Sequence, residues 1–213
     1  MTRGKFIALE GGEGMGKSTQ GQLLADALRE CGFSVELTRE PGGTPGAEAI
    51  RGLLLDPPGE GWGPQAEAML FAAARSDHVA RLIRPAIERG AWVVCDRYLD
   101  SSRAYQGAAG ELGDEQVRAL HEIGSDGLLP DMTLVMTADE ADVSTRLQHR
   151  DGGATDAIGG RDADYHAAVN EAFTAFARAE PERFSLIDGN GSIEEVHSRI
   201  MQAIDPLIGE CGE

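Results

Sequence analysis

The sequence predicts an α/β fold built on a doubly wound sheet of five parallel strands with helices on its flanks. Two observations support this prediction: five short apolar runs are spread along the chain, and helical patterns lie between them. Strands that alternate with helices form a parallel sheet, and such sheets bind ligands at the carboxyl ends of their strands.

The five apolar runs are short and continuous, which is typical of strands that are buried on both faces. The predicted strands span residues 6–9, 35–37, 92–95, 133–136 and 184–187.

The predicted helices fill the spaces between these strands. The first spans residues 20–31 and ends at Gly32, since glycine readily adopts the backbone conformation that closes a helix. The last spans 193–204 and follows Ser192, with Glu195 three residues later in the pattern of a capping box. Three further helices are expected at 67–88, 116–123 and 165–178.

Two segments do not fit the alternation of strands and helices. Residues 56–64 are rich in proline and glycine and predict a surface loop. Residues 151–160 are polar and rich in glycine, which fits either a flexible linker or a mobile lid over an active site. With no internal repeat, we expect one domain over residues 1–213 that carries a lid at about 148–162.

The composition narrows the class of partner. The formal net charge of -17 disfavours nucleic acids and membrane surfaces, because both repel an acidic protein. The three cysteines are scattered without metal-ligand spacing, and the apolar run near the N-terminus is too short for a signal peptide. These features predict a cytoplasmic protein with reduced thiols.

A phosphate-binding loop follows the first predicted strand. Its residues Gly11, Gly12, Glu13, Gly14, Met15, Gly16, Lys17 and Ser18 match the pattern G-x-x-x-x-G-K-[ST], and we assign them with Thr19 to ATP binding. Glycines let successive backbone N–H groups point inward as an anion nest, at the N-terminus of a helix that also favours negative charge. The lysine can reach the β- and γ-phosphates, and the serine hydroxyl can bind Mg²⁺.

Asp96 directly follows the third apolar run. An acid at the end of such a strand lies beside the phosphate loop, so Ser18 and Asp96 are the predicted metal ligands for Mg²⁺ as cofactor, with ATP as co-substrate. A regulatory GTPase would also need an N-K-x-D segment, but no lysine follows Lys17. The P-loop fold is therefore not expected to be that of a regulatory GTPase, and a second substrate has to be identified from other segments.

Three further segments resemble thymidylate kinase of the nucleoside monophosphate kinases. They are Arg39-Glu40-Pro41-Gly42-Gly43-Thr44, the helical segment from Phe71 to Arg75, and Asp96-Arg97-Tyr98 followed by Ser101-Ser102 and Tyr105-Gln106-Gly107. With the phosphate loop, they stand in the order and spacing of that family along essentially the whole chain. The resemblance implies the reaction ATP + dTMP → ADP + dTDP, supplying dTTP synthesis, and a homodimer.

The resemblance also implies roles at the acceptor sugar and phosphate. Glu13 is expected to accept a hydrogen bond from the 3′-hydroxyl of dTMP. Arg97 and Arg51 are expected to hold its phosphate, since the planar guanidinium binds two phosphate oxygens at once.

Around the thymine, Phe71 is expected to stack on the base, although its pattern also fits a plain core position. Arg75 lies four residues later on the same helical face and is expected to bind a thymine carbonyl. The remaining expected contacts are Ser102 and Gln106 at the pyrimidine edge, Tyr105 under the sugar, and Pro41 after Glu40 at the thymine methyl group.

The chain departs from the family pattern in the lid. Family members place an extra arginine either in the phosphate loop, where this chain has Gly14, or in an Asp-Arg-x-Glu segment of the lid, as the bacterial type does. Here Gly14 fits the bacterial type, but Ala157 stands at the expected arginine of the lid. We expect Arg150 or Arg161 to supply the missing charge, so the predicted catalytic residues are Lys17, Arg97, Arg150 and Arg161.

Two other functions remain open from the sequence. Another nucleoside monophosphate kinase would share everything except the base pocket. A non-catalytic ATP-binding regulator is disfavoured, because the phosphate loop, the metal acid and the acceptor-site arginines are all present.

Overall fold

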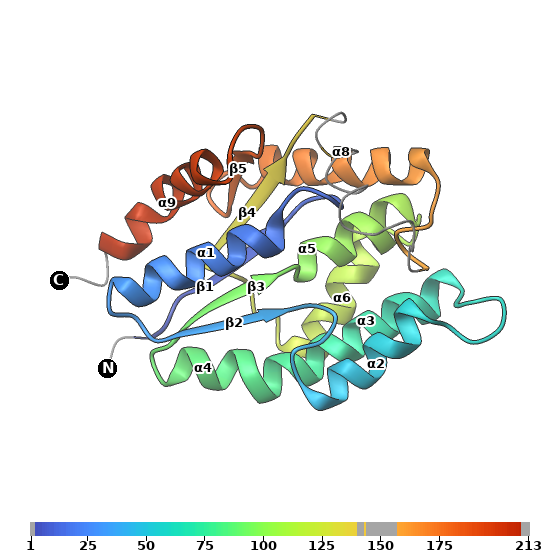
Figure 1. Cartoon of the computed structure of the whole chain (residues 1–213). Coiled ribbons are helices and arrows are strands. Elements are labelled where there is room, and N and C mark those ends of the chain that lie inside the picture. Colours follow the sequence, from blue (N-terminus) through green and yellow to red (C-terminus); the bar gives the residue numbers. More distant parts are fainter. Residues whose placement is uncertain (1–2, 140–142, 144–156, 210–213) are drawn as a thin grey trace.

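The computed structural model describes residues 3–139, 143 and 157–209. The described chain forms a five-stranded parallel sheet in the order β2-β3-β1-β4-β5 (Figure 1). Its strands are β1 (Phe6–Glu10), β2 (Val35–Arg39), β3 (Trp92–Asp96), β4 (Met132–Thr137) and β5 (Phe184–Asp188). All five predicted strands are confirmed, and β1, at the centre of the sheet, is buried along its whole length.

Every strand ends on a polar residue that the apolar pattern did not include: Glu10, Arg39, Asp96, Thr137 and Asp188. These residues share the carboxyl edge of the sheet, where parallel α/β folds bind their ligands.

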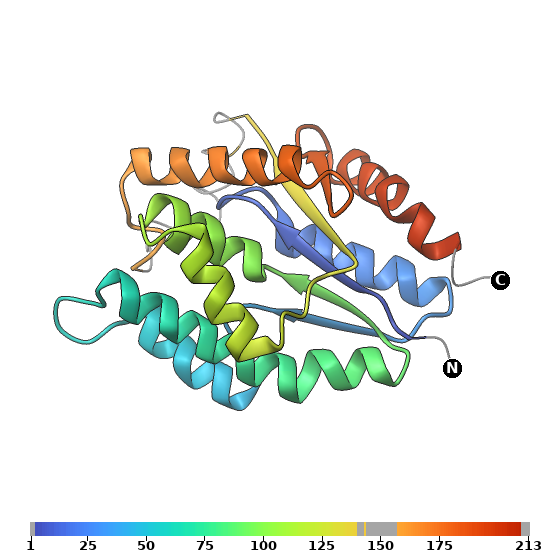
Figure 2. The ribbon, with the colours of Figure 1, turned by 180° about the vertical axis from the view of Figure 1, so that it is seen from behind.

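Helices cover both faces of the sheet because side chains alternate along a strand. Ile7 and Leu9 of β1 pack in a core with α1 (Lys17–Glu30) and α9 (Ile193–Gly209). Phe6 and Ala8 point the other way, into a core with the helices of the opposite face, which is seen from behind in Figure 2. That face carries α3 (Pro64–His78), η1 (Val79–Ile83), α4 (Arg84–Glu88) and α6 (Asp114–Ser125), while α8 (Ala163–Ala179) lies over β4 and β5.

The long helix expected at 67–88 is present as α3, η1 and α4 in succession. A π-helical turn, η1, joins the two α-helical parts just before Pro85. Because proline has no N–H to donate, a wider turn at this point accommodates its ring. The helices expected at 20–31, 116–123, 165–178 and 193–204 are present with ends that differ by a few residues.

Two helical segments were not predicted. α2 (Pro45–Leu55) begins at the N-cap Thr44, whose side chain accepts a hydrogen bond from the backbone N–H of Ala47. It packs along α3, and the loop expected at 56–64 connects the two. α5 (Leu99–Ser102) and η2 (Arg103–Ala109) follow β3 directly and carry several of the expected acceptor-site residues.

Candidate active site

The phosphate loop connects β1 to α1 through glycines with left-handed backbones. Gly11, Gly14 and Gly16 have φ of 130°, 70° and 87°. A Cβ on Gly11 would also lie 2.5 Å from the carbonyl oxygen of Met136 on β4, so only glycine fits this position. The loop therefore curls against the carboxyl edge of the sheet.

Lys17 is held inside this loop. It opens α1, is 7% exposed, and its Nζ donates to the carbonyl oxygens of Gly11 at 3.0 Å and Gly12 at 2.5 Å. Burial, followed by the positive charge of Arg97, lowers the pKa of Lys17 to about 7. An anionic ligand would oppose both effects and favour the charged form.

Ser18 and Asp96 meet across the start of α1 and the end of β3. The Ser18 hydroxyl donates to Oδ2 of Asp96 at 2.6 Å. This pair of oxygen groups beside an anion-binding loop suits Mg²⁺, which binds few protein ligands and completes its shell with water and phosphate oxygens. Among the described residues, no group of three or more acidic, histidine or cysteine side chains could hold a metal by itself.

Arg97 is the first residue after β3, and its backbone is left-handed, with φ of 70°. Its Nη1 donates to the carbonyl oxygen of Gly11 at 3.1 Å and to Oγ of Ser101 at 3.2 Å, and its guanidinium lies 5.0 Å from the centre of the Tyr105 ring. Although burial opposes its charge, Tyr105 and Asp96 hold the pKa of Arg97 above its usual value. The backbone turn thus directs a permanent cation towards the phosphate loop.

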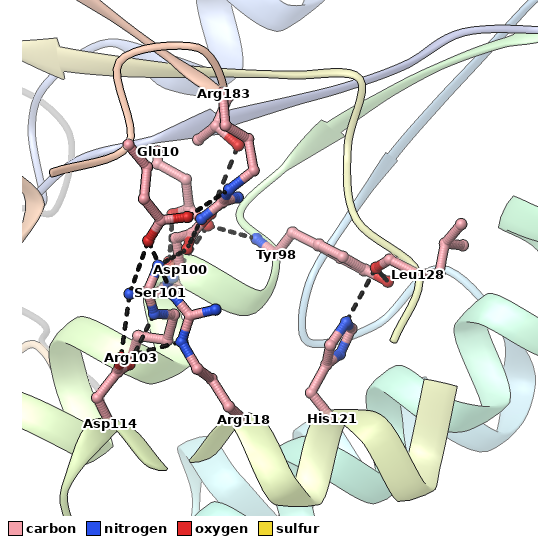
Figure 3. A network of polar contacts seen from close by, with 12 residues as sticks. Glu10, Tyr98, Asp100, Ser101, Arg103, Asp114, Arg118, His121, Leu128 and Arg183 are labelled. Carbon is pink, nitrogen blue, oxygen red and sulfur yellow. Dashed lines mark hydrogen bonds and ion pairs between the residues drawn. The ribbon is translucent and has the colours of Figure 1, made fainter. Parts of the chain in front are cut away.

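Glu10 fixes this turn, although no role was predicted for it. Its carboxylate accepts hydrogen bonds from the backbone N–H groups of Tyr98 at 2.8 Å and Ser101 at 2.9 Å, and from the Ser101 hydroxyl at 2.6 Å (Figure 3). Burial, and then the negative charge of Asp100, raise the pKa of Glu10 to about 7. An acid at the end of a strand that is otherwise apolar is the signal that could have found it.

Behind Glu10, a network of ion pairs joins α5 to the residue before β5 and, through Arg103 of η2, to α6 (Figure 3). Asp100 is completely buried and binds Arg103 at 2.7 Å and Arg183 at 2.8 Å. Although burial opposes ionisation, the hydrogen bonds and charge of Arg183, together with Arg103, hold the pKa of Asp100 below its usual value. The network anchors the helix that follows Arg97.

A cavity of about 370 Å³ opens beside the phosphate loop. It brings together most of the residues assigned above to the acceptor substrate: Glu13, Glu40, Pro41, Arg51, Phe71, Arg97, Ser102, Tyr105 and Gln106. Lys17, Ser18, Asp96 and Arg39 also line it. The cavity draws on β2, α2, α3, the end of β3, α5 and η2, so distant parts of the sequence converge there.

Arg75 lies behind this wall. It is 3% exposed, its Nε donates to Glu40 at 2.7 Å, and its Nη2 donates to the Ser102 hydroxyl at 2.9 Å. Glu40 also binds Nδ1 of His78 at 3.0 Å. Although burial opposes it, the charge of Arg75 holds the pKa of Glu40 below its usual value. Two lining residues, Glu40 and Ser102, are therefore held in place by an arginine expected to bind the base.

A second cavity, of about 490 Å³, lies on the other side of the phosphate loop. Much of its wall is the loop itself, and the opposite wall is the turn between β5 and α9, with Gly189, Gly191 and Ser192. This turn was not assigned a role from the sequence. Its position could have been predicted, because it is a glycine-rich turn at the carboxyl end of the fifth strand, where parallel sheets bind ligands.

The described part of the expected lid, residues 157–162, borders the first cavity. Ile158 lines it, and a Cβ on Gly159 would lie 3.1 Å from a carboxylate oxygen of Glu13. Arg161 binds Glu67 of α3 and the hydroxyl of Tyr165. Arg150, the other expected lid arginine, lies outside the described residues.

Glu67 was not predicted either. One of its oxygens accepts a hydrogen bond from Nε2 of Gln106 at 2.9 Å, and the other binds Arg161. Its spacing of four residues from Phe71 and eight from Arg75 places all three on one helical face, which is a signal that the sequence contains.

Comparisons with known proteins show the family of this chain. The model of the thymidylate kinase family matches residues 9–200. The thymidylate kinase of Rhizorhabdus wittichii is 53% identical over 205 residues, covering 96% of this chain and 99% of the relative. That of Rhodopseudomonas palustris is 47% identical over 204 residues, covering 95% and 89%.

The fold agrees as well. The crystal structure of thymidylate kinase from Ehrlichia chaffeensis superposes with a TM-score of 0.78 at 28% identity, covering 95% of this chain and 99% of the other. None of the described helices is long and apolar enough to cross a membrane. The chain belongs to the thymidylate kinase family.

Proposed function

We propose that this protein transfers the γ-phosphoryl group of ATP to dTMP and yields ADP and dTDP. One observation carries the proposal: Lys17 and Ser18 line both cavities. Two nucleotides seated in the two cavities would thus bring their phosphates to one wall. Family membership supports dTMP as the acceptor.

On the donor side, the phosphate loop from Gly11 to Thr19 holds the ATP phosphates with its backbone N–H groups. Lys17 compensates charge on the β- and γ-phosphates. Ser18 and Asp96 would hold Mg²⁺, and the ion would offset the negative charge of the phosphates. The cavity bounded by the Gly189–Ser192 turn takes the nucleoside of ATP.

On the acceptor side, Arg97 and Arg51 bind the dTMP phosphate. Arg51 is anchored by its Nη1, which donates to the carbonyl oxygen of Pro41 at 2.8 Å. Glu13 accepts from the 3′-hydroxyl, and Tyr105 packs under the sugar. Phe71, Ser102, Gln106 and the Glu40–Pro41 wall surround the thymine, and Arg75 would have to extend past Glu40 and Ser102 to reach a thymine carbonyl.

The transfer itself needs no protein nucleophile. An oxygen of the dTMP phosphate attacks the γ-phosphorus, a new P–O bond forms, and the bond to the bridging β–γ oxygen breaks and leaves ADP. Arg97 and Lys17 stabilise the charge that spreads over the transferred group. Arg97 is permanently charged, and bound phosphate favours the charged form of Lys17. These two positive charges let the two anionic phosphates approach each other.

A lid arginine completes the charge compensation in this proposal. Replacing Arg150 or Arg161 by alanine should lower kcat for dTMP by well over tenfold for the arginine that reaches the phosphoryl group. Arg161 would have to leave Glu67 to do so. If neither variant loses more than about tenfold in kcat, no lid arginine serves this role.

Steady-state ADP release with dTMP, dUMP, dCMP, dGMP and AMP tests the function. We expect dTMP to have the highest kcat/KM. A preference for AMP or dCMP would indicate another nucleoside monophosphate kinase, and a lack of turnover with every acceptor would indicate a non-catalytic regulator.

We also propose that the enzyme acts in the cytoplasm as a homodimer, with one domain over residues 1–213 and a lid at 148–162. Family resemblance supports the dimer. Light scattering coupled to size-exclusion chromatography tests it, since a monomer and a dimer differ twofold in mass.

A further inference from the structure

Glu67 is a buried acid that contacts the acceptor cavity only through another residue. It lies on α3, is 8% exposed, and does not itself line the cavity. Its two carboxylate oxygens bind different partners: Oε1 accepts from Nε2 of Gln106, and Oε2 binds Nη2 of Arg161. Gln106 is 2% exposed and lines the cavity.

The charge of Glu67 determines which way the Gln106 amide faces. A carboxylate can only accept hydrogen bonds, and an amide carries a donor on one side and an acceptor on the other. The Gln106 nitrogen must therefore face Glu67, because a flipped amide would place two oxygens against each other. The amide oxygen is consequently fixed on the side away from Glu67.

This orientation matters for the pyrimidine edge. Thymine and uracil present an N3–H donor, whereas cytosine presents an unprotonated N3 acceptor. An amide oxygen opposite N3 accepts from thymine and repels cytosine. A freely flipping amide would serve both bases.

We propose that Glu67 is a positioning residue that locks the Gln106 amide in the orientation that accepts from N3–H and thereby selects thymine over cytosine. The inference rests on the proposed dTMP site. It adds a residue that acts on specificity without touching the substrate.

Arg161 ties this selection to the lid. Its guanidinium binds the second oxygen of Glu67 and the Tyr165 hydroxyl, and that hydroxyl donates to the backbone oxygen of Tyr105 at 2.6 Å. Tyr105 directly precedes Gln106 in η2. The lid segment thus supports both the carboxylate that orients the amide and the turn that carries it.

The decisive variant is Glu67→Gln, because its amide can either donate to Gln106 or accept from it. We expect the ratio of kcat/KM for dTMP to that for dCMP to fall about tenfold or more. In the wild type, a flipped Gln106 amide would place its oxygen against a carboxylate oxygen of Glu67, and the variant removes this penalty. The ratio of dTMP to dUMP should not change, because these bases share the same N3–H edge. Kd values for the three nucleotides, measured by isothermal titration calorimetry, should give the same pattern without turnover.

Controls separate this role from a general loss of structure. Glu171→Gln on α8 makes the same chemical change at an exposed position and should leave both ratios unchanged. Should Glu67→Gln fold poorly with Arg161 unpaired, the double variant Glu67→Gln/Arg161→Gln removes both charges and repeats the test. An unchanged dTMP to dCMP ratio in a folded variant overturns the proposal.

Arg161→Ala tests the lid connection. If Arg161 acts through Glu67, the dTMP to dCMP ratio should fall, by less than in Glu67→Gln. A uniform loss of kcat for all acceptors with an unchanged ratio would overturn this connection and assign Arg161 to the phosphoryl group instead. If the wild-type enzyme turns over no acceptor, the proposed function fails, while the Kd ratios still report whether Glu67 sets the base preference.

Discussion

The two cavities that share Lys17 are lined by different kinds of residue. The wall of the donor cavity is largely backbone and small residues, with Gly14, Gly16, Gly189 and Gly191 among its lining. The acceptor cavity is lined by charged and polar side chains, many of which are held by a second polar side chain behind them. In the proposed function, the donor nucleotide would therefore be recognised largely by the glycine-rich loop and turn, and the acceptor by side chains that depend on tertiary partners.

The largest effect is expected at the shared wall. Lys17→Met removes the cation common to both cavities while keeping a side chain of similar length. We expect kcat to fall by about 10³-fold or more, because no other described side chain lines both cavities with a positive charge. Stopped-flow or steady-state ADP release measures this.

Lys17→Arg is the matched control for charge, and it should recover only part of the activity because the guanidinium does not fit the space of an ammonium. A loss of kcat below tenfold in Lys17→Met would contradict the proposed role of Lys17 between the two cavities.

Glu40→Gln tests the acceptor side. It leaves Arg75 buried without its ionised partner, which typically costs about 3 kcal/mol or more. For a chain of this size the melting temperature should fall by roughly 6–12 °C, and KM for dTMP should rise more than KM for ATP. Differential scanning fluorimetry and substrate titrations measure the two effects.

Glu48→Gln provides the comparison, since Glu48 pairs with Arg39 at the surface. Its melting temperature should fall by no more than about 4 °C, less than in Glu40→Gln. An equal shift in both variants would mean that burial of the Glu40 pair has no special importance.

Asp100→Asn tests the network of ion pairs that Asp100 forms with Arg103 and Arg183. We expect a loss of about 2–3 kcal/mol at neutral pH, less than at Glu40, because Arg103 and Arg183 keep Glu180 as a partner. The pKa of Asp100 is below its ordinary value of 3.8 in the folded protein, so its pairing stabilises the fold above that pH and is lost as the pH falls below it. Urea unfolding of wild type and variant between pH 7 and pH 2.5 should therefore show a gap that is constant near neutrality and closes in acid. A gap that persists at the lowest pH would show that the ionised form of Asp100 is not what stabilises the helix.

The smallest effect is expected on the donor side away from Lys17. Gly191 has a φ of 102°, which strains any residue with a Cβ. Gly191→Ala should raise KM for ATP by about tenfold and leave KM for dTMP unchanged. Gly209→Ala, a substitution at a glycine with open space around it, is the control. A matching rise in KM for dTMP would contradict the division between the two cavities.

The same division explains what could be predicted from the sequence. The strands and the phosphate loop depend on local patterns, so apolar runs and the glycine spacing were sufficient. The helix α2 was missed although Thr44 and Pro45 are a cap and a first-turn proline, because Gly46 and Gly52 weaken its helical pattern. The helix α5 was missed because its start is fixed by Glu10, a residue almost ninety positions earlier.

The candidate site divides in the same way. Most residues that line the acceptor cavity were found through family motifs, whereas Glu10 and Glu67 were not, because their partners lie far away in sequence. A carboxylate that acts on another side chain leaves only a weak local pattern. For Glu10 it is an acid that ends an apolar run, and for Glu67 it is the helical spacing with Phe71 and Arg75.

The arginines and Lys17 that line the acceptor cavity have a consequence for association rates. The chain as a whole carries a formal charge of -17, so the field at a distance repels a nucleotide, while Lys17 and three arginines outnumber the three acids that line the cavity. Salt screens interactions beyond about 8 Å at physiological ionic strength far more than those between groups in contact. Moderate salt should therefore quicken the arrival of nucleotides, the opposite of an enzyme that steers its substrates electrostatically from afar.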